Sequence, residues 1–490
     1  MQPKVLLNAL KTSSFVRLVV ATRLKHSSTD PLEDVLPQKW TELGERIQKQ
    51  VIATGYEHLL ARRACVKESL AKRGMETDIV DQLLKTLERH NLIVERVKSL
   101  DKERKNNHET FNAAQSEEEK SLAKDRGVQL KRDIAKFEEE RRELKDKMMP
   151  VLTQLPNEVH PHTPVGGYKD SRVVEEHGQK RKFSFPVKSH IEIGNQLDLY
   201  DYRGSSSASV NGFCYLKGAA AMLEMALVQF ALQTAVSKGY TPVIPPDIIR
   251  TEMVEGCGFQ PRGPSSQVFH VTSNHHRGTN LCLAGTAELP LAGMFVGKNV
   301  PFKQLPIRLV AFGRCYRAEA GGSTLLAKGL YRLHQFSKVE LFGVTSQETG
   351  RESVESLEDM LSVQKEILSS LGLHYRVLEM ATAELGAPAY RKYDVEVWMP
   401  GRGEYGEVTS ASNCTDYQSR RLSITYPNQD GRRDKRGVLE TKYAHTVNAT
   451  GCAVPRVIIS LLENYQQEDG SVLLPHALRP FLPEQYWTIR

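Results

Sequence analysis

The chain has 490 residues, of which 40% are hydrophobic and 26% are charged, and its formal net charge is +7. This length can hold a large core and two domains, and the composition is typical of a globular protein. No run of 18 or more apolar residues occurs, so the sequence predicts no membrane span.

The cysteines are odd in number and include no C-x-x-C pair. This pattern favours a reduced compartment without disulfides and argues against structural zinc. The doublet His275-His276 has no cysteine or carboxylate nearby at ligand spacing, so we expect a solvated loop there. The seven cysteines stand at positions 65, 214, 257, 282, 315, 414 and 452.

The N-terminal segment is basic and carries no acid before Asp30. Its cations are spread among leucines, valines and hydroxyl residues, which is typical of a mitochondrial transit peptide, and we expect one over residues 1–28. A secretory signal is disfavoured because cations interrupt the apolar run; a frayed basic tail remains an alternative. Without these five cations, 61 basic residues face 59 acidic ones and the net charge is near +2, so overall basicity only weakly indicates nucleic-acid binding. They are Lys4, Lys11, Arg17, Arg23 and Lys25.

Residues 78–150 carry two apolar seams on either side of a polar stretch at 104–120. Steps of three, four and seven residues predict an antiparallel helical hairpin, with each helix roughly 40–50 Å long. A dimerising coiled coil or a spacer fits this periodicity as well as an RNA-binding arm does. The seams are Val80, Leu84, Leu87, Val94, Val97 and Leu100, then Leu130, Ile134, Phe137, Leu144 and Met148.

Four prolines at 148–166 are expected to end the second helix and mark a domain boundary. Beyond it, short strand-like runs outnumber helices, which predicts an antiparallel sheet of α+β type. No G-x-G-x-x-G or complete phosphate-loop motif is present. The expected strands lie in 300–319, 373–380, 392–400 and 406–414, an amphipathic helix at 218–240, and a helix with Pro455 in its first turn at 452–467.

Residues 315–342 read as one hairpin that carries Arg, Phe and Glu, and three further stretches combine charge with hydroxyl groups. Together they resemble the active-site motifs of the seryl-tRNA synthetases, which are class II aminoacyl-tRNA synthetases. The resemblance covers about residues 150–480, and the hairpin lies where that family has its tRNA-binding arm. The motifs are "GTAE" (285–288), "CYRAE…GLYRLHQFSKVE" (315–340), "GEVTSASNCTDYQSRR" (406–421) and "VNATGCAVPRVIISLLENYQ" (447–466).

The resemblance implies a class II catalytic domain, in which an antiparallel sheet is flanked by helices. It also implies that the chain has three parts. They are a transit peptide at 1–28, a helical tRNA-binding arm domain at 29–155 and the catalytic domain at 156–490. The stretch "SKGYTPVIPPDIIR" (237–250) resembles the family's motif 1, which implies a homodimer. With the basic N-terminus, the animal mitochondrial branch fits best, acting in the matrix.

For ATP, the resemblance implies that Arg317 holds the serine carboxylate and the α-phosphate, because a planar guanidinium suits both anions. Glu319, expected on the same strand face, would accept from the adenine amino group, Phe336 would stack on the ring, and Arg456 would grip the γ-phosphate. Glu407 and Ser410 would hold Mg²⁺. The implied ATP set is Arg317, Ala318, Glu319, Leu333, Phe336, Glu407, Val408, Thr409, Ser410 and Arg456, with Arg317, Glu407 and Arg456 as catalytic residues.

For serine, the resemblance implies that Glu288 and Thr286 hold the ammonium group, while Glu340 and Thr450 address the hydroxyl group. Thr286 could equally cap a helix, since Ala287-Glu288 and an apolar run follow it. No base for transfer to tRNA is evident. The implied serine set is Thr286, Ala287, Glu288, Glu340, Asn448 and Thr450.

These residues imply ATP-dependent attachment of L-serine to mitochondrial tRNA(Ser) through a seryl-adenylate. The alternative is a synthetase-like paralogue that keeps the fold as a non-catalytic binding or regulatory protein. A coiled-coil assembly factor would leave the four motifs unexplained, and a ligase for another small amino acid is disfavoured by "TAE" and "NCTDYQSRR". Two departures are Lys328, where many relatives have Arg, and the Ala449-Thr450…Pro455 pattern.

Overall fold

The computed structural model describes residues 36–490 apart from 261–265, 273–279, 320–328 and 434–436. The expected transit peptide, the loop at His275-His276 and Lys328 therefore lie outside the described residues.

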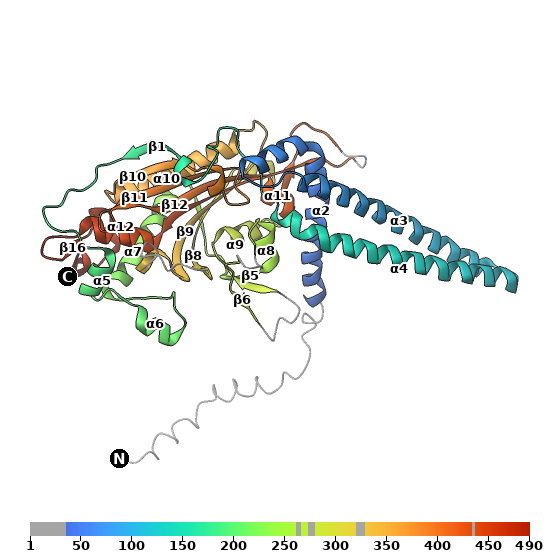
Figure 1. Cartoon of the computed structure of the whole chain (residues 1–490), viewed down its shortest axis with the longest axis horizontal. Coiled ribbons are helices and arrows are strands. Elements are labelled where there is room, and N and C mark those ends of the chain that lie inside the picture. Colours follow the sequence, from blue (N-terminus) through green and yellow to red (C-terminus); the bar gives the residue numbers. More distant parts are fainter. Residues whose placement is uncertain (1–35, 261–265, 273–279, 320–328, 434–436) are drawn as a thin grey trace, which may run out of the picture. The chain divides into compact units, whose positions relative to one another are not determined.

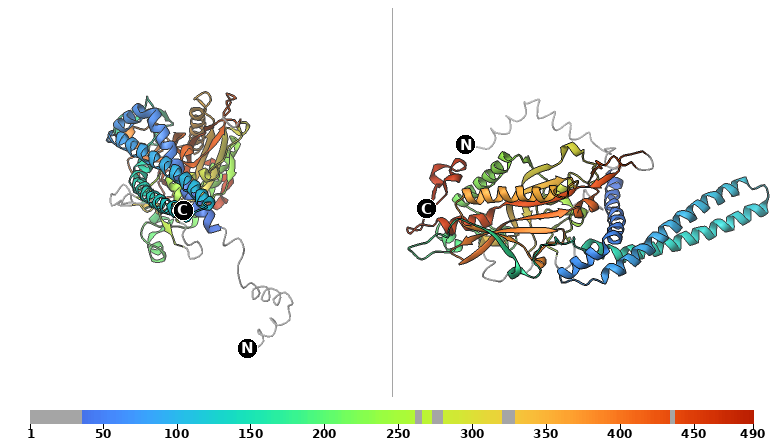
Figure 2. Two further views of the ribbon diagram at one scale, coloured as in Figure 1. Left: turned by 90° about the vertical axis from the view of Figure 1, so that its right-hand side faces the viewer. Right: turned by 90° about the horizontal axis from the view of Figure 1, so that it is seen from above.

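The N-terminal part of the described chain consists of three long helices. They are α2 (Leu36–Lys72), which is kinked at Arg62, α3 (Ile79–Ala113) and α4 (Glu117–Gln154). Figures 1 and 2 show α3 and α4 side by side as the predicted antiparallel hairpin, with the reversal inside the predicted polar stretch. Ser116 begins α4 with a capping box, because its hydroxyl accepts from the Glu119 N–H and the Glu119 carboxylate accepts in return. Helix α2 was not specifically predicted.

The predicted apolar seam closes the hairpin, and its residues are buried more completely on α3 than on α4. Val80, Leu87 and Leu100 of α3 are buried with Leu130 and Met148 of α4. Leu84 and Val97 of α3 are buried as well, and Ile93 takes the buried place expected for its neighbour Val94. The expected members of α4 that are partly exposed are Ile134, Phe137 and Leu144. The exchange of Val94 for Ile93 fits the drift of a 3.6-residue helix against a 3.5-residue pattern.

The second helix of the hairpin ends where the prolines require it. Helix α4 contains Pro150 and stops at Gln154, and Leu155, which precedes Pro156, is extended. A residue before proline is pushed out of the helical region, so Pro156 and not Pro150 ends the helix.

The rest of the chain is built on one eight-stranded sheet (Figure 1). Neighbouring strands are antiparallel except for the edge pair β4–β8, so the sheet is mixed but mostly antiparallel, and the predicted α+β class is confirmed. Each of the four expected strands is present. The order is β1 (Arg172–His177), β10 (Tyr375–Glu379), β11 (Arg391–Met399), β12 (Glu404–Thr415), β15 (His445–Ala453), β9 (Gln335–Thr345), β8 (Ile307–Tyr316) and β4 (Thr241–Val243).

Three helices pack on one face of this sheet and form the main core. They are α7 (Gly218–Ser237), α10 (Glu352–Ser370) and α12 (Val454–Tyr465), and they contact the central strands β9, β12 and β15. Alternation along β9 sends Val339 and Leu341 into this core, because successive side chains of a strand point to opposite faces. The polar positions between them face the other side of the sheet.

Helix α7 differs from the amphipathic helix that was predicted. Its apolar residues surround the helix, and it is the one described helix with the length and composition of a membrane span. It nevertheless packs on β8, β9 and β15, while Met225 and Val236 are exposed. A helix that is apolar all round can bury two faces at once.

Smaller elements surround the other face. A three-stranded sheet of β5 (Ile248–Arg250), β7 (Leu281–Leu283) and β6 (His270–Val271) lies with α8 (Thr251–Gly256) and α9 (Glu288–Gly293). The remaining elements are α5 (His190–Gln196), β2 (Tyr200–Asp201), α6 (Tyr202–Ala208), β3 (Tyr215–Leu216), α11 (Tyr417–Leu422), β13 (Thr425–Pro427), β14 (Thr441–Tyr443), β16 (Val472–Leu473) and β17 (Thr488–Ile489).

The burial along the hairpin seam predicts that two leucines of α4 contribute very differently to the stability of the hairpin. Leu130 is fully buried, whereas Leu122 is 67% exposed. We expect Leu130→Ala to lower the free energy of opening of α3 and α4 by about 2–5 kcal/mol and Leu122→Ala to leave it nearly unchanged. Amide hydrogen exchange of the two helices measures this; equal effects of both variants would show that the seam does not hold the hairpin.

Candidate active site

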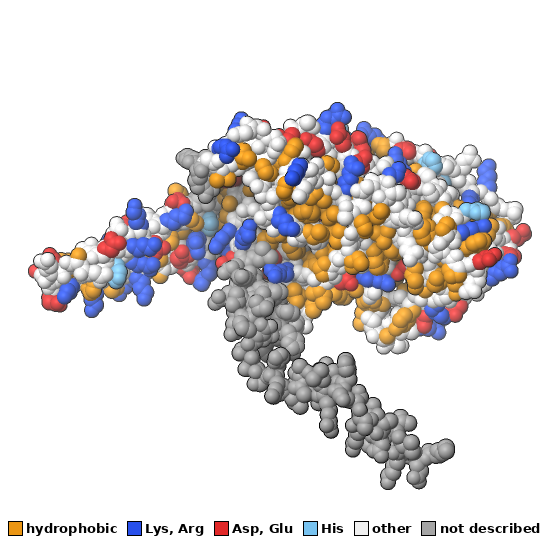
Figure 3. All heavy atoms as spheres, turned by 180° about the vertical axis from the view of Figure 1, so that it is seen from behind, with side chains coloured by type: hydrophobic (Ala, Val, Ile, Leu, Met, Phe, Trp, Pro, Cys, Tyr) orange, Lys and Arg blue, Asp and Glu red, His pale blue; other side chains and the backbone are white. Residues whose placement is uncertain are grey.

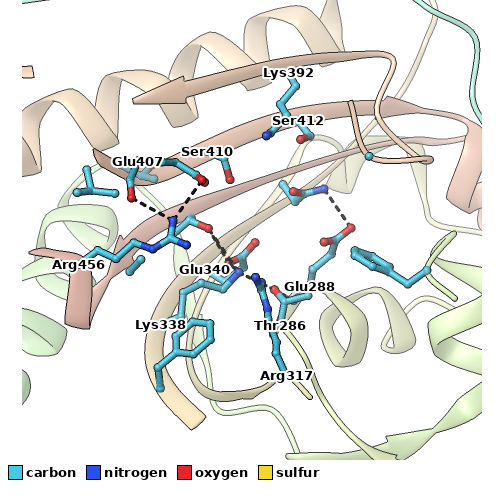
Figure 4. A pocket seen from close by; sticks show the side chains of 18 of the residues that line it. Thr286, Glu288, Arg317, Lys338, Glu340, Lys392, Glu407, Ser410, Ser412 and Arg456 are labelled. Atoms are coloured by element: carbon cyan, nitrogen blue, oxygen red, sulfur yellow. Dashed lines mark hydrogen bonds and ion pairs between the residues drawn. The ribbon is translucent and has the colours of Figure 1, made fainter. Parts of the chain in front are cut away.

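A deep pocket opens on the face of the sheet opposite α7, α10 and α12. Its volume is about 410 Å³, within the range of roughly 300–1,000 Å³ common for small-molecule sites. The strands β9, β12 and β15 form its floor, and residues after β8 and at the start of α9 and α12 form its sides (Figure 4). Four sequence motifs that are far apart along the chain therefore meet in one cavity.

The pocket collects nearly all of the predicted site residues. Of the two predicted sets, only Ala287 and Ala318 do not line it. Ala287 is buried as the N-cap of α9, and the Ala318 N–H donates to the Gln267 carbonyl oxygen. The lining members are Thr286, Glu288, Arg317, Glu319, Leu333, Phe336, Glu340, Glu407, Val408, Thr409, Ser410, Asn448, Thr450 and Arg456.

Two β-bulges bring polar residues onto the pocket face. In β12 the register shifts between Glu407 and Thr409, so Val408 is the extra residue. Without it, Glu407 and Ser410 would point to opposite faces, because they are three residues apart; the added residue puts both into the pocket (Figure 4). A second shift in β15 follows Thr450, which lies directly opposite Glu340 of β9.

A buried lysine lies at the centre of the predicted serine end. The Lys338 Nζ is 2.6 Å from Glu340 Oε2 and donates to Thr286 Oγ1 at 2.9 Å and to Thr450 Oγ1 at 3.4 Å. Thr450 also donates to Glu340 Oε2 at 3.4 Å. One ammonium group thus holds three of the residues predicted to bind serine (Figure 4).

Glu288 occupies a second buried position at the same end of the pocket, where serine is predicted to bind. Its Oε1 accepts from Gln418 Nε2 at 2.6 Å and from Asn448 Nδ2 at 3.1 Å. Burial and the negative charge of Glu340 raise the pKa of Glu288 to about 7, and the bond from Gln418 limits the rise. A group with this pKa changes charge near neutral pH.

Thr286 lines the pocket and also bonds to the start of α9. Its Oγ1 accepts a weak bond of 3.4 Å from the Glu288 N–H at the start of α9, as a cap does, and a shorter one from Lys338. Ala287 holds the N-cap position itself, and Thr286 lines the pocket, so a bond to the helix start does not prevent a contact with a ligand.

Arg317 enters the pocket from just beyond β8, which ends at Tyr316. Its Nε donates to the Gly285 carbonyl oxygen at 3.2 Å, and its guanidinium carbon lies 5.3 Å from the Phe336 ring centre. Figure 4 shows Arg317 pointing toward Thr286 and Lys338. The expectation that Glu319 shares a strand face with Arg317 is wrong, because both follow the strand's end; Glu319 lies 3.6 Å from Arg332 in an ion pair.

Arg456, on the first turn of α12, forms an ion pair with Glu407 at 3.2 Å and donates to its carbonyl oxygen at 3.0 Å. Burial would raise the pKa of Glu407, but the charges of Arg456 and Lys392 hold it below its usual value. Glu407 is therefore a carboxylate at neutral pH. With Ser410 on the same face it offers two hard oxygens to a cation, and bound phosphates and water would supply the remaining ligands.

The sequence predictions missed several polar residues of the pocket region, among them Lys338, Gln418 and Lys392. Lys338 lies between Phe336 and Glu340 on β9, so strand alternation alone places it on the same face. Gln418, in the string "NCTDYQSRR", acts through Glu288, and its own Oε1 accepts from Thr446. Lys392 lines the pocket and is 2.9 Å from Asp394. No signal in a single sequence distinguishes Gln418 from a surface residue.

Two family descriptions match separate parts of the chain. Residues 57–159 match the seryl-tRNA synthetase N-terminal domain, and residues 269–465 match the tRNA synthetase class II core domain (G, H, P, S and T). The first covers the hairpin, and the second covers the strands and helices that build the pocket.

Curated relatives and solved structures agree with these matches. The mitochondrial serine–tRNA ligase of Mus musculus is 48% identical over 357 residues, which are 73% of this chain and 67% of that relative. The serine–tRNA ligase of Rubrobacter xylanophilus is 40% identical over 85% of this chain and 95% of its own length. The crystal structure of seryl-tRNA synthetase from Pyrococcus horikoshii complexed with ATP has a TM-score of 0.72 at 32% identity, covering 87% of this chain and 97% of that one.

Arginines, carboxylates and hydroxyls converge in this cavity on a mostly antiparallel sheet, and the sequence is similar to these relatives over most of its length. The chain therefore belongs to the seryl-tRNA synthetases of class II.

Proposed function

We propose that this chain joins L-serine to tRNA(Ser) in mitochondria, using ATP to form a seryl-adenylate and releasing diphosphate. The observation that carries this proposal is the buried group of Lys338, Glu340, Thr286 and Thr450 beside Arg317 in one pocket. This group offers hydrogen bonds to a small hydroxylated amino acid, and the guanidinium of Arg317 next to it can bind two anions.

In the activation step the serine carboxylate attacks the α-phosphorus of ATP, and the bond to diphosphate breaks. Two anions must approach each other, so positioning and positive charge supply most of the catalysis. Arg317 would hold the carboxylate and the α-phosphate together, Phe336 would stack on adenine and Arg456 would bind the γ-phosphate. Release of Arg456 from Glu407 would then free that carboxylate for the cation.

Mg²⁺ is the metal that this donor set suits, because Glu407 and Ser410 supply hard oxygens on one face. When bound, it would neutralise charge on the phosphates and help diphosphate to leave. The charges of Arg456 and Lys392 hold the pKa of Glu407 below its usual value, which favours the ionised form that a metal needs.

Serine selection follows from the buried polar groups. A substrate without the hydroxyl would form no hydrogen bond with Glu340 or Thr450, and a site built for that bond can reject the analogue by roughly 10⁴-fold or more. Lys338 keeps both groups fixed before the substrate arrives. Threonine carries one more methyl group than serine, so its rejection requires a wall against that methyl group.

The oligomer that we propose is a homodimer formed through α7 and residues 237–250. Apolar residues of this region are exposed, namely Met225 (57%), Val236 (43%), Ile244 (93%) and Ile248 (50%). Hydrophobic side chains also gather over a broad face of the catalytic domain in Figure 3. Large exposed apolar areas mark protein interfaces.

The location that we propose is the mitochondrial matrix. Residues 1–28 carry five cations and no acid, and relatives that include the Mus musculus protein are mitochondrial. A basic, acid-free amphipathic segment suits import into this compartment.

ATP–diphosphate exchange tests the activity directly. We expect exchange with serine and at least about 100-fold less with alanine, threonine or glycine. Arg317→Ala should reduce the serine-dependent rate by roughly 10²–10³-fold, because a preorganised cationic contact with the reacting anions is lost. Arg351→Ala is the control, since that side chain is 79% exposed. Absence of exchange with every amino acid would favour a non-catalytic paralogue.

The pKa of Glu288 predicts how serine binding depends on pH. Its carboxylate must be ionised to hold the ammonium group, and with a pKa of about 7 it becomes protonated as the pH falls. The KM for serine should therefore rise by roughly ten-fold from pH 8 to pH 6, while the KM for ATP changes much less. A serine KM that stays constant over this range would contradict the assignment of Glu288 to the ammonium group.

The arm is proposed to bind tRNA and to take no part in the first reaction. Lys131 and Arg132 are exposed on α4. Replacing both by glutamate should weaken serine transfer to tRNA several-fold and leave diphosphate exchange unchanged, because phosphate contacts need positive charge. Lys303→Glu, at an exposed position outside the arm, is the control. Equal losses in both assays would count against the arm as an RNA-binding element.

A further inference from the structure

One wall of the pocket is a short loop that is held from outside the catalytic sheet. Residues 386–389, here called the wall segment, line the pocket between β10 and β11. The loop has no strand partner of its own, so its backbone position depends on the groups that bond to its carbonyl oxygens. Those groups come from the two ends of the helical hairpin.

Arg73 forms hydrogen bonds on both sides of the wall segment, to the residue just before it and to its last residue. It follows the last residue of α2, where Gly74 has a positive φ of 71° and the Met75 N–H donates back to the Leu70 carbonyl. The Arg73 guanidinium donates to the carbonyl oxygens of Leu385 at 3.1 Å and Ala389 at 2.7 Å.

The surroundings of the Arg73 guanidinium are unfavourable for its charge, so its position is not explained by a contribution to the stability of the fold alone. Burial lowers the pKa of Arg73 to about 10. Among the described residues no carboxylate pairs with it, and its Nε has no hydrogen-bond partner there. A buried guanidinium without an anionic partner costs free energy, whereas its two bonds fix the wall segment in place.

Asn157 holds the middle of the wall segment from the other end of the hairpin. This side chain is 4% exposed and lies three residues after α4. Its backbone N–H donates to the Ala387 carbonyl at 2.7 Å, and its Nδ2 donates to the carbonyl oxygens of Pro388 and Cys414, both at 2.9 Å.

Cys414 continues this connection to the serine end of the pocket. Its Sγ accepts from Asn448 Nδ2 at 3.5 Å, and the same amide donates to Glu288. A shift of Asn157 would therefore move the wall segment and also a strand residue next to the group predicted to hold the ammonium.

We infer that Arg73 and Asn157 are positioning residues that couple the hairpin to the pocket, so that tRNA held on the hairpin changes the affinity for serine. The two residues flank α3 and α4 in the sequence, and all of the hairpin lies between them. Movement at its base is transmitted through four carbonyl oxygens of residues 385–389. This inference rests on the proposed function, since it needs a serine site and a tRNA-binding arm.

The test measures coupling with a tRNA that cannot reach the pocket. The probe is a tRNA(Ser) transcript without its 3′-terminal CCA, added to full-length protein during serine-dependent ATP–diphosphate exchange. For the unmodified protein we expect a change in the serine KM of at least about five-fold, the lower end of common allosteric couplings. Arg73→Met should reduce the change to less than two-fold, while the KM for serine without tRNA remains measurable.

A matched variant separates this coupling from general damage at the hairpin base. Arg62→Ala removes the paired bonds from Arg62 to Glu158, at 2.8 and 2.6 Å, and touches no carbonyl of the wall segment. It should retain the tRNA effect. Arg73→Lys keeps the charge but not the fork that spans two carbonyls, so it should lose most of the effect and decides the question if Arg73→Met does not fold.

The outcomes distinguish this inference from the proposed function. A full tRNA effect in both Arg73 variants, the same loss in Arg62→Ala, or no effect in the unmodified protein would overturn the coupling while serine-dependent exchange persists. No exchange with serine under any condition would overturn the proposed function instead.

Discussion

The Lys338–Glu340 ion pair is the interaction on which the pocket depends. Glu340 and Glu288 are both buried in the same cavity, and two carboxylates there without a cation would carry a large desolvation and repulsion cost. Lys338 offsets this cost with a 2.6 Å contact and uses its other N–H groups to fix Thr286 and Thr450. A single charge therefore sets the geometry of the groups predicted to bind the serine hydroxyl before any ligand binds.

The sheet supplies the second constraint, because it must present apolar side chains to three helices and polar ones to the pocket. Strict alternation on β9 achieves this with Val339 and Leu341 on one face and Lys338 and Glu340 on the other. Strand β12 cannot do so without its bulge at Val408. The departure from regular pairing is what gathers Glu407 and Ser410 on the catalytic side.

Much of this organisation could be predicted from the sequence, and its failures have physical causes. The hairpin and the strands followed from periodicity, and the motifs named most of the pocket lining. Lys338 was overlooked although alternation places it between Phe336 and Glu340. Glu319 was placed on a strand that ends three residues earlier, and α7 was taken as amphipathic although apolar residues surround it. Local patterns state which side chains are apolar but not how many faces of an element are covered.

The sequence by itself determined the elements, the family and the residue types that the chemistry requires, because these depend on local spacing and on motifs that remain intact along the chain. Only the tertiary structure decided which charges compensate one another. The pairing of Arg456 with Glu407 and the grip of Arg73 and Asn157 on residues 385–389 join positions far apart in sequence. Such contacts depend on strand register and on the paths of loops, which no local pattern encodes.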